Sequence, residues 1–315
     1  MGKNFVIRIG IAGIGKIARD QHIPVLNAVE AFELVACASR NTRVDGVRNF
    51  PTAEAMLDGC PDLDAIAICT PPQVHYETAK LALKRGKHVL LEKPPCATTA
   101  QLDQLTTLAR DANRTLYQTW HSRHASRVDS AQHWLSSRKV QSASVIWKED
   151  VRLWHPGQTW IWQAGGFGIF DPGINAISIL TRIVPERIFV TAADLFVPSN
   201  CASPIAADIV FATDAGARIV AALDFRHTGV QTWDIDIKTD SGTLKLSGGG
   251  SVLSVDGTVA TTDEIQNPHG EYESVYRRFA DLIERGQSDV DARPFQLVAD
   301  CFLAGKHHTV EPFIE

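Results

Sequence analysis

A lysine held between a glutamate and a proline, Glu92-Lys93-Pro94, ends a strand-like apolar run at residues 87–91. In open α/β sheets, reactive groups lie beyond the carboxyl ends of the strands. An ammonium group in that place could orient a substrate hydroxyl and stabilise negative charge that develops on its oxygen. A solvent-facing lysine is the plain alternative, so the tripeptide gains its meaning from other parts of the chain.

A glycine-rich turn, Gly13-x-Gly15-x-x-Ala18, follows the first strand-like run and opens a helix. Gly13 permits a tight turn, Gly15 lets the backbone approach a pyrophosphate, and Ala18 permits close packing of helix and strand. Unpaired N–H groups at the helix start, at Lys16 and Ile17, would face the phosphates. We therefore expect a dinucleotide cofactor, with an ordinary tight turn as the alternative.

The second strand ends in Ala38-Ser39-Arg40, without the acidic residue that commonly binds the ribose of NAD. Ser39 and Arg40 could instead donate hydrogen bonds to the 2′-phosphate of NADP, and the guanidinium geometry suits a phosphate. The alternative is a solvated loop. We expect NADP as the preferred cofactor and NAD as the second option.

Asp171 and Asn175 lie one helical turn apart after a glycine-rich segment. The pair Asp171-Pro172 is typical of a helix start, with the aspartate as N-cap and the proline at the first helical position. Backbone donors and the helix dipole favour an ionised carboxylate there, which would be a ready but weak base. A capped helix with a polar face explains the same residues without any catalysis.

An aromatic and polar run holds six of the seven tryptophans, Trp120, Trp147, Trp154, Trp160, Trp162 and Trp233, together with His121, Glu149 and His155. Such a stretch could form a sugar site, although about half of the tryptophans would serve as plain core. Zinc is a rival interpretation for His121 and His155, because His121-x-x-His124 has a ligand-like spacing. No cysteine or further histidine completes that set, so we expect no metal.

The elements that must position these residues change in kind near residue 122. Before it, strands are expected at 6–11, 33–38, 64–69, 88–91 and 116–120, and helices after the glycine turn (interrupted by Pro24), at 74–85 and from 98. Strands that alternate with helices predict a parallel sheet with right-handed crossovers. We expect residues 1–122 to form the dinucleotide-binding domain.

The rest of the chain, residues 123–315, is expected to form a domain for substrate binding and oligomerisation. Its expected strands are 142–151, 187–192, 207–212, 217–226, 232–239 and 243–246, and its expected helices are 127–136, 174–183, 272–285 and 293–304. Successive strands without helices between them predict a mostly antiparallel sheet.

The bulk composition excludes several classes of protein. The 315 residues carry a net charge of -5, which argues against a nucleic-acid partner because phosphate binding needs a basic face. No apolar run approaches the length of a membrane span, and the first residues enter a strand at once, so no signal peptide is expected. The six scattered cysteines are expected to be reduced, buried thiols of a cytoplasmic protein.

Over nearly its whole length the chain resembles the glucose–fructose oxidoreductase and inositol dehydrogenase family. The motifs that carry the resemblance are Gly13-x-Gly15-x-x-Ala18, Ile68-Cys69-Thr70-Pro71-Pro72-x-x-His75, Leu91-Glu92-Lys93-Pro94 and Gly165-Gly166-x-Gly168-x-x-Asp171-x-Gly173-x-Asn175. Three C-terminal motifs resemble one branch, the bacterial L-arabinose and D-galactose 1-dehydrogenases: Glu271-Tyr272, Tyr276-Arg277-Arg278-Phe279-Ala280 and Asp291-x-Arg293-Pro294. Most members of the family carry histidine where this chain and that branch carry Asn175.

The resemblance implies a Rossmann domain followed by a domain with an open, largely antiparallel sheet. It also implies that the open face of this sheet joins subunits, as a homodimer or homotetramer. Its implied cofactor contacts are Gly13, Gly15, Lys16, Ile17, Ser39, Arg40, Thr70, Pro71, His75, Glu92 and Lys93. Its implied substrate contacts are His121, Glu149, Trp154, His155, Asp171, Asn175 and Trp233.

The activity that the resemblance implies is that of an NAD(P)-dependent aldose 1-dehydrogenase, which oxidises the anomeric carbon of an arabinose- or galactose-type pyranose to a lactone. Lys93, Asp171 and Asn175 would be its catalytic residues. Asn175 cannot exchange a proton near neutral pH, so Lys93 and Asp171 would handle the proton. An inositol or other sugar-alcohol dehydrogenase, and a non-catalytic NAD(P)-binding regulator, are the alternatives.

Overall fold

The computed structural model describes residues 6–260 and 270–314. Contacts divide the chain into two compact units, Met1–Trp120 with Gln266–Ala292 and His121–Ile265 with Arg293–Glu315. The single boundary expected near residue 122 therefore omits the return of the chain to its first unit. The first five residues, where no signal peptide was expected, lie outside the described part.

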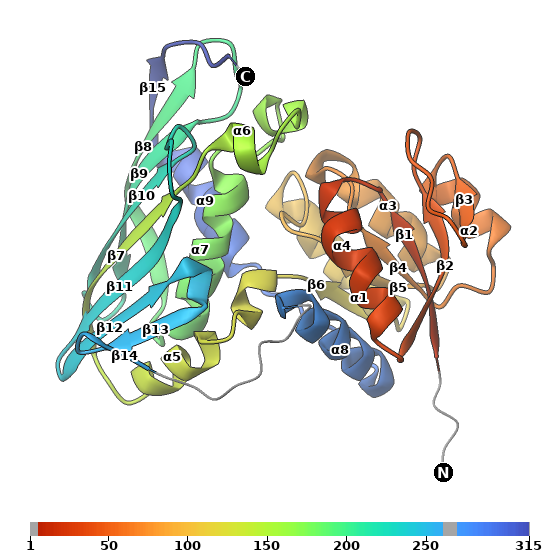
Figure 1. Ribbon diagram of the computed structural model, residues 1–315, viewed down its shortest axis with the longest axis horizontal. Helices are drawn as coiled ribbons and strands as arrows, with labels where there is room; N and C mark the ends of the chain where they lie inside the picture. The colour runs from red at the N-terminus through yellow and green to blue at the C-terminus, as the bar shows by residue number, and fades with distance from the viewer. Residues whose placement is uncertain (1–5, 261–269, 315) are drawn as a thin grey trace. The chain divides into compact units, whose positions relative to one another are not determined.

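The first unit is built on a six-stranded sheet with the strand order β3-β2-β1-β4-β5-β6 (Figure 1). Its strands are β1 (Ile7–Ala12), β2 (Phe32–Ala38), β3 (Arg48–Phe50), β4 (Ala65–Ile68), β5 (His88–Leu91) and β6 (Leu116–Gln118). Its helices are η1 (Ala18–His22, a π-helix), α1 (Ile23–Ala28), α2 (Ala53–Gly59), α3 (Pro72–Lys84), α4 (Thr99–Asp111) and α8 (Gly270–Arg285). All of these strand pairs are parallel, and the order is that of dinucleotide-binding folds, as the sequence predicted.

Helices cover both faces of this sheet because side chains alternate between the faces along each strand. Ile9 and Ile11 of β1 are fully buried in a cluster with residues of α1 and α8. A side chain at Gly10, between them, would instead meet Met56 of α2. The crossovers β1-α1-β2 and β4-α3-β5 run in opposite directions along the sheet, and their common right hand places α1 and α3 on opposite faces.

Three local signals that the sequence offered have different outcomes. Thr98 caps α4, since its hydroxyl accepts a hydrogen bond from the backbone N–H of Gln101. Gly86 follows α3 with φ of +69°, the left-handed conformation of a helix C-terminus. Pro24 does not end the helical stretch; it is the second residue of α1, directly after the π-helix η1, where the helical hydrogen-bond pattern changes.

Helix α8 belongs to the first unit because its apolar face packs on the parallel sheet. Phe279 stacks on Phe32, with ring centroids 6.0 Å apart, and on Tyr117 at 6.2 Å. The segment after α8 also continues the sheet, since Asp289 exchanges backbone hydrogen bonds with Leu116 and Gln118 of the edge strand β6. These contacts are distant in sequence, so a boundary drawn from local pattern misses them.

The second unit holds a nine-stranded sheet with the order β14-β13-β12-β11-β7-β10-β9-β8-β15. Its strands are β7 (Val140–Lys148), β8 (Ile188–Pro198), β9 (Ala206–Thr213), β10 (Arg218–Asp224), β11 (Thr232–Thr239), β12 (Gly242–Ser247), β13 (Val252–Val255), β14 (Thr258–Val259) and β15 (Lys306–Val310). Its helices are η2 (His121–His124), α5 (Val128–Leu135), α6 (Val151–Trp154), η3 (Thr159–Trp162), α7 (Phe170–Ile183), η4 (Gly248–Gly250) and α9 (Arg293–Ala304). Only β10–β7 and β15–β8 are parallel among the described pairs, so the expected mostly antiparallel sheet is confirmed.

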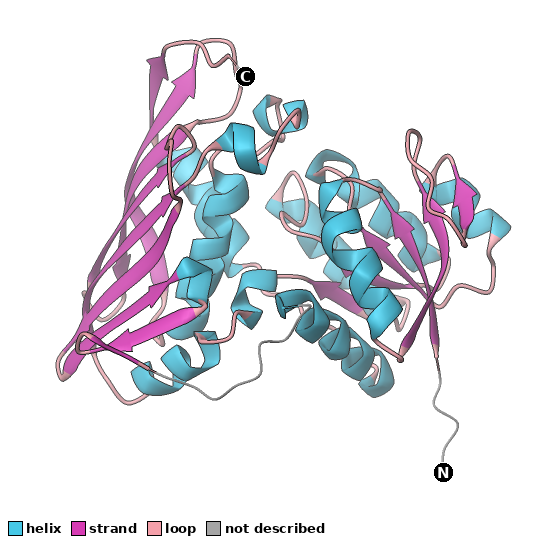
Figure 2. Cartoon of the chain, in the orientation of Figure 1, coloured by secondary structure: helices cyan, strands magenta, loops and turns pink. Residues whose placement is uncertain are grey.

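One face of this sheet is covered and the other is bare of described helices. Helices α5, α7 and α9 lie on the covered face (Figure 2). Along β7, Val145 and Trp147 point into that layer and are 3% exposed, whereas Ser144 and Ile146 point to the bare face. The period of two along the strand thus produces an open sheet.

All six cysteines are free thiols, and five of them are buried. Burial raises the pKa of Cys37 to about 11 and that of Cys96 to about 12, so both stay protonated near neutral pH. Among the described residues, no helix combines the length and the apolar character that crossing a bilayer requires.

Candidate functional site

The glycine turn at the end of β1 has one glycine that the protein needs and one that it does not. Gly13 has φ of +94°, and a Cβ there would lie 2.7 Å from the backbone nitrogen of Thr70. A Cβ at Gly15 would meet nothing within 4 Å, so no neighbour in the protein requires a glycine there. An exposed backbone that is kept bare on its outer side fits the close approach of a pyrophosphate.

The residues after this turn begin a continuous helical stretch over residues 16–28, so Lys16 and Ile17 carry first-turn N–H groups. Lys16 is exposed and forms an ion pair with Asp20. At the end of β2, the Ser39 hydroxyl accepts the backbone N–H of Thr42 at 3.2 Å, which shapes the turn. Arg40 is exposed beside it. Both halves of a nucleotide site, the turn and a cationic end of β2, are therefore present on one sheet edge.

Thr70, Pro71 and His75 lie at the β4–α3 turn, but the histidine faces inward. His75 is fully buried, and its ring nitrogens contact the backbone oxygens of Thr70 and, at 3.2 Å, of Pro95. Desolvation lowers the pKa of His75, so the neutral imidazole is favoured. The sequence predicted a contact between His75 and the cofactor, but this side chain exposes no atom. It instead connects the turn at Thr70 to the turn at Pro95.

Glu92 is also buried, at 3% exposure, and its carboxylate is engaged by the protein itself. Oε2 accepts the backbone N–H of Lys93 at 2.9 Å. Oε1 accepts the hydroxyl of Tyr272 at 3.0 Å and lies 3.2 Å from His22 Nε2. The expected contact of this side chain with a cofactor is thus replaced by a network that fixes the Lys93 turn.

His22 and Tyr276 complete this network. His22 Nδ1 lies 2.8 Å from the Tyr276 hydroxyl, and the imidazole is fully buried. A ring protonated at Nε2 donates to Glu92 and accepts from Tyr276 through Nδ1, which satisfies both contacts. Burial raises the pKa of both Tyr272 and Tyr276 well above the usual value, so both remain phenols that can donate.

Lys93 follows the network directly and keeps its side chain partly exposed. Its bond to Pro94 is cis, which answers a question that the sequence left open. The Glu92 carboxylate therefore holds the turn that carries the lysine, through the hydrogen bond that it accepts from the Lys93 N–H. This group of predicted site residues lies wholly in the first unit.

The second unit gathers a second group of predicted site residues around the end of β7. Glu149 follows this strand and is 3% exposed; its Oε2 accepts the indole N–H of Trp233 at 2.8 Å. Trp233 stands opposite Trp147 in the sheet register and also packs against Trp154, at 5.0 Å between ring centroids. Trp154 and Trp233 remain partly exposed, as a ring that meets a sugar must be.

His155 lies between two buried carboxylates. Its Nε2 is 3.4 Å from Glu149 Oε1, and its Nδ1 is 3.7 Å from Asp171 Oδ2. The backbone N–H of His155 donates to the Val151 carbonyl at the end of α6, and the imidazole packs edge-on against Phe225, with centroids 5.4 Å apart. Of the seven residues expected to contact substrate, Glu149, Trp154, His155, Asp171 and Trp233 are thus linked by contacts within this unit.

Asp171 does not cap its helix, which corrects the sequence interpretation. Helix α7 begins one residue earlier, at Phe170, and its N-cap is Ile169, which makes no side-chain cap. Gly168 adopts φ of +52°, and the backbone N–H of Asp171 bonds to its carbonyl, so the helical turn forms before the aspartate. The carboxylate faces His155 instead, with Oδ2 at 3.7 Å from Nδ1.

Asn175 lies one turn further along α7 and is partly exposed. His121 begins η2, which Arg123 anchors to α7 through the Ser178 carbonyl at 2.9 Å and the Thr181 hydroxyl at 2.9 Å. Helix α7 therefore positions three predicted site residues of the second unit. It carries Asp171 and Asn175, and it holds η2, which carries His121.

The tryptophans of the aromatic stretch do not all have the same surroundings. Trp120 and Trp147 are buried core residues, and Trp162 packs on Phe225 and Phe313. Within the described ranges, no group of three or more histidine, cysteine or acidic side chains is placed to hold a metal ion.

Sequence reasoning missed His22 altogether and named Tyr272 and Tyr276 only as parts of a motif. A buried acceptor at residue 92 demands donors, but nothing in the sequence tells which donors reach it. The spacing of Tyr272, Tyr276 and Phe279, at three and four residues, was the available signal for an inward-facing helix surface.

Comparison with known proteins gives a family match over the first unit and a relative that matches almost the whole chain. The family model described as "Oxidoreductase family, NAD-binding Rossmann fold" matches residues 7–119. A galactose 1-dehydrogenase of Pseudomonas fluorescens is 46% identical over 309 residues, which cover 98% of this chain and 99% of that protein.

Solved structures give the same picture. The crystal structure of D-galactose-1-dehydrogenase from Rhizobium etli superposes with a TM-score of 0.93 at 49% identity and covers 100% of both chains. A 3-ketoreductase from Actinomadura kijaniata, in complex with NADP, has a TM-score of 0.80 at 20% identity over 98% of this chain and 100% of that one. At that identity the second likeness concerns the fold alone.

The Glu92 network leads to a prediction about stability. Tyr272→Phe removes a hydrogen-bond donor from a buried carboxylate without changing the ring. We therefore expect the free energy of unfolding of the first unit, measured in urea, to fall by about 1.5–3 kcal/mol, as for hydrogen bonds to charged groups. Tyr76→Phe is the matched control, because Tyr76 is half-buried on α3 and its ring contact with Lys80 survives the change. Equal effects of the two substitutions would show that the Tyr272 hydroxyl contributes nothing.

Proposed function

The chain belongs to the oxidoreductase family with an NAD-binding Rossmann fold, and on that premise we propose that it is an aldose 1-dehydrogenase that acts on galactose- or arabinose-type pyranoses. The family membership and the full-length likeness to galactose 1-dehydrogenase make the chain an NAD(P)-dependent sugar dehydrogenase. What we add by proposal are the preferred sugar, the preferred nucleotide and the roles of individual residues.

The observation that carries the proposal is the 46% identity to the Pseudomonas fluorescens enzyme across 98% of this chain. That enzyme is named for galactose, and nothing in the comparisons favours arabinose over it. L-Arabinopyranose lacks the exocyclic hydroxymethyl group of D-galactopyranose, and loss of a methylene from an apolar contact changes binding only by about 1–3 kcal/mol. We therefore propose D-galactose as the first sugar to test, and L-arabinose as the second.

The cofactor would be held by the first unit, through the bare turn at Gly15, the N–H groups of Lys16 and Ile17, and the Ser39-Arg40 end of β2. Thr70 and Pro71 would line the next strand end. When bound, the nicotinamide supplies a two-electron acceptor for the hydride of the sugar carbon. Arg40 is exposed, and no acidic residue stands at the expected place on β2, so we propose that NADP is preferred over NAD.

The proton of the anomeric hydroxyl would pass to Asp171, and Lys93 would donate to the same oxygen. Anomeric hydroxyls are more acidic than ordinary alcohols, so a weak carboxylate base is adequate for them. Asn175 would hold the oxygen by a hydrogen bond, since an amide cannot take the proton. These roles favour oxidation at the anomeric carbon over an inositol or another sugar alcohol.

The sugar itself would contact the partly exposed rings of Trp154 and Trp233, together with His121 and His155. Glu149 was expected among these contacts. Because its carboxylate is buried against Trp233 and His155, we propose that it acts behind them and orients both rings.

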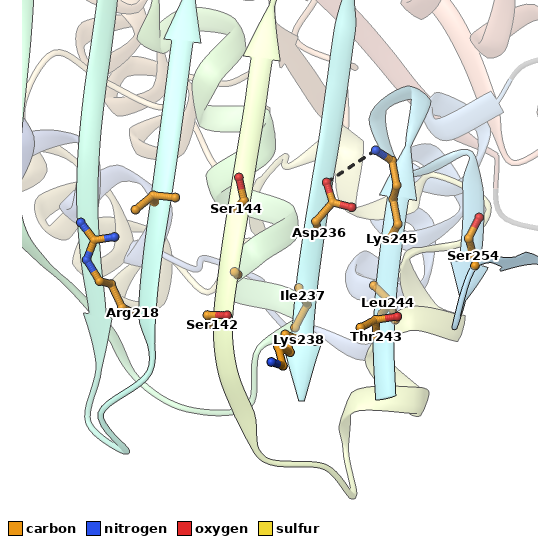
Figure 3. A pocket seen from close by; sticks show the side chains of 13 residues that line it. Ser142, Ser144, Arg218, Asp236, Ile237, Lys238, Thr243, Leu244, Lys245 and Ser254 are labelled. Carbon is orange, nitrogen blue, oxygen red and sulfur yellow. Dashed lines mark ion pairs between the residues drawn. The ribbon is translucent and has the colours of Figure 1, made fainter. Parts of the chain in front are cut away.

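The bare face of the nine-stranded sheet is the surface that we propose joins copies of this chain. A hollow of about 730 Å³ lies on it, lined by residues of β7, β10, β11, β12 and β13 and by Gly257 (Figure 3). Lys245 forms ion pairs there with Asp234 at 2.8 Å and with Asp236 at 3.5 Å, and Ile146 is 36% exposed nearby on β7. A flat face of paired charges and scattered apolar side chains suits an isologous contact with a second copy.

The six free cysteines favour a reducing compartment, and we propose the cytoplasm. A disulfide bond in the native protein would contradict this location.

The function is tested by following reduced cofactor with D-galactose, L-arabinose, D-fucose, D-xylose and myo-inositol, each with NAD and with NADP. We expect the highest kcat/KM with galactose or arabinose, and a lactone as product. Asp171→Ala is the negative control and should lose orders of magnitude in kcat while it still binds the cofactor. A preference for myo-inositol would support the alternative dehydrogenase, and near-normal turnover by the variant would remove Asp171 from the mechanism.

The nucleotide preference is tested at Arg40. Arg40→Ala should lower kcat/KM for NADP about tenfold, because a charge-assisted hydrogen bond to the phosphate contributes at least 1.4 kcal/mol, and it should leave the value for NAD nearly unchanged. Arg43→Ala is the control, because Arg43 is also exposed and lies three residues after Arg40. A parallel loss with both nucleotides would refute the assignment.

The subunit contact is tested by light scattering of the purified protein. We expect a dimer or tetramer for the native chain and a smaller assembly for Ile146→Glu, which introduces a charge at the bare face. Val74→Glu is the control, because Val74 is 48% exposed on α3 in the first unit. A monomeric native protein would overturn the proposal.

A further inference from the structure

We propose that His155 is a proton relay, which takes from Asp171 the proton of the substrate hydroxyl and passes it to water, while Glu149 holds the imidazole in the tautomer that this requires. The inference rests on the proposed role of Asp171 as the base. It concerns what happens to the proton after that first transfer, and it assigns a role to two residues that were expected only to contact sugar.

The geometry consists of a line of three side chains. Asp171 Oδ2 lies 3.7 Å from His155 Nδ1, and Nε2 on the other side of the ring lies 3.4 Å from Glu149 Oε1. Both carboxylate side chains are at most 4% exposed, whereas that of His155 is 16% exposed. The imidazole is therefore the member of the line that reaches solvent.

The two sides of the imidazole are not equivalent. Glu149 accepts the Trp233 indole N–H through Oε2, which turns Oε1 toward His155. A proton on Nε2 is favoured by this facing carboxylate, and Nδ1 then carries a lone pair. Nδ1 is buried and has no hydrogen-bond partner among the described residues.

An unpaired ring nitrogen beside a carboxylate is repulsive while both present lone pairs, which agrees with a separation beyond hydrogen-bond length. The same contact becomes a hydrogen bond once a proton lies on Asp171, because the carboxylic acid donates and Nδ1 accepts. Catalytic hydrogen bonds that are long in the free enzyme commonly tighten in the complex. Asp171 and His155 therefore attract each other only after Asp171 has taken the proton of the substrate.

The proton moves in two steps that balance. In the first, the O–H bond of the anomeric hydroxyl breaks and an O–H bond forms on Asp171. In the second, that bond breaks and an N–H bond forms at Nδ1, which leaves Asp171 ionised and His155 as an imidazolium whose Nε2–H faces Glu149. Loss of one proton to water returns the neutral ring, so Asp171 is again a base for the next turnover.

The surroundings keep the ring in place for this exchange. His155 ends α6, its backbone N–H bonds to Val151, and its face is fixed by the edge contact with Phe225. The short helix α6 is itself capped by Asp150, whose side chain accepts the N–H of Arg152 at 2.9 Å.

Chemical rescue provides the central test. His155→Ala should lower kcat about a hundredfold, the lower end of acid–base contributions, without change in the dissociation constant of NADPH measured by its fluorescence. Added imidazole should restore part of kcat in a saturable manner, because a free base can occupy the vacated, partly exposed site. A C1-deuterated sugar checks that the chemical step limits the rate of the variant.

A double-mutant cycle separates the relay from a structural role. If His155 acts through Asp171, then His155→Ala should cause no further loss of kcat in an Asp171→Asn background. Glu149→Gln is the second variant; it keeps an acceptor for Trp233 but offers no charge to Nε2–H, so we expect a lower kcat with little change in the KM for sugar. His133→Ala, an exposed histidine of α5, should neither slow the enzyme nor respond to imidazole.

The outcomes distinguish the two levels of the proposal. If the wild-type enzyme reduces the cofactor with none of the tested sugars, the proposed function itself is overturned. An active wild type whose His155→Ala variant changes only the KM for sugar, ignores imidazole, or loses activity additively with Asp171→Asn would overturn the relay alone.

Discussion

The first unit depends on one buried negative charge. The carboxylate of Glu92 sits at the end of a buried parallel strand, where an unpaired charge would cost several kcal/mol. The protein satisfies it with the N–H of the next residue, with a tyrosine of α8 and with a histidine of the π-helical stretch after the glycine turn. One acceptor therefore joins three segments that are separated by 70 and 180 residues.

This constraint explains why a helix near the C-terminus is part of the Rossmann unit. Helix α8 supplies the hydroxyl that Glu92 needs and the aromatic face that covers β1 and β2. The reactive-looking Lys93 turn is thus fixed by residues from both ends of the chain.

The second unit uses buried carboxylates in a different way. Glu149 and Asp171 approach one imidazole from opposite sides, and the sheet and α7 hold them there. In the first unit the buried charge is saturated by donors, which favours a fixed shape. In the second unit one ring nitrogen, Nδ1 of His155, has no hydrogen-bond partner in the described part of the chain, so it can accept a proton.

The sequence by itself determined the elements and the chemical groups. The period of two along the strands, the glycine turn, the Thr98 cap and the lysine at a strand end are local features, and local sterics and hydrogen bonding fix them. Tertiary structure alone decided which groups meet: that His75 and Glu92 face inward, that α8 joins the first unit, that Asp171 leaves its expected cap, and that His155 lies between two acids. Each of these depends on contacts between residues far apart in the chain, and no local pattern encodes the partner that a buried polar group will find.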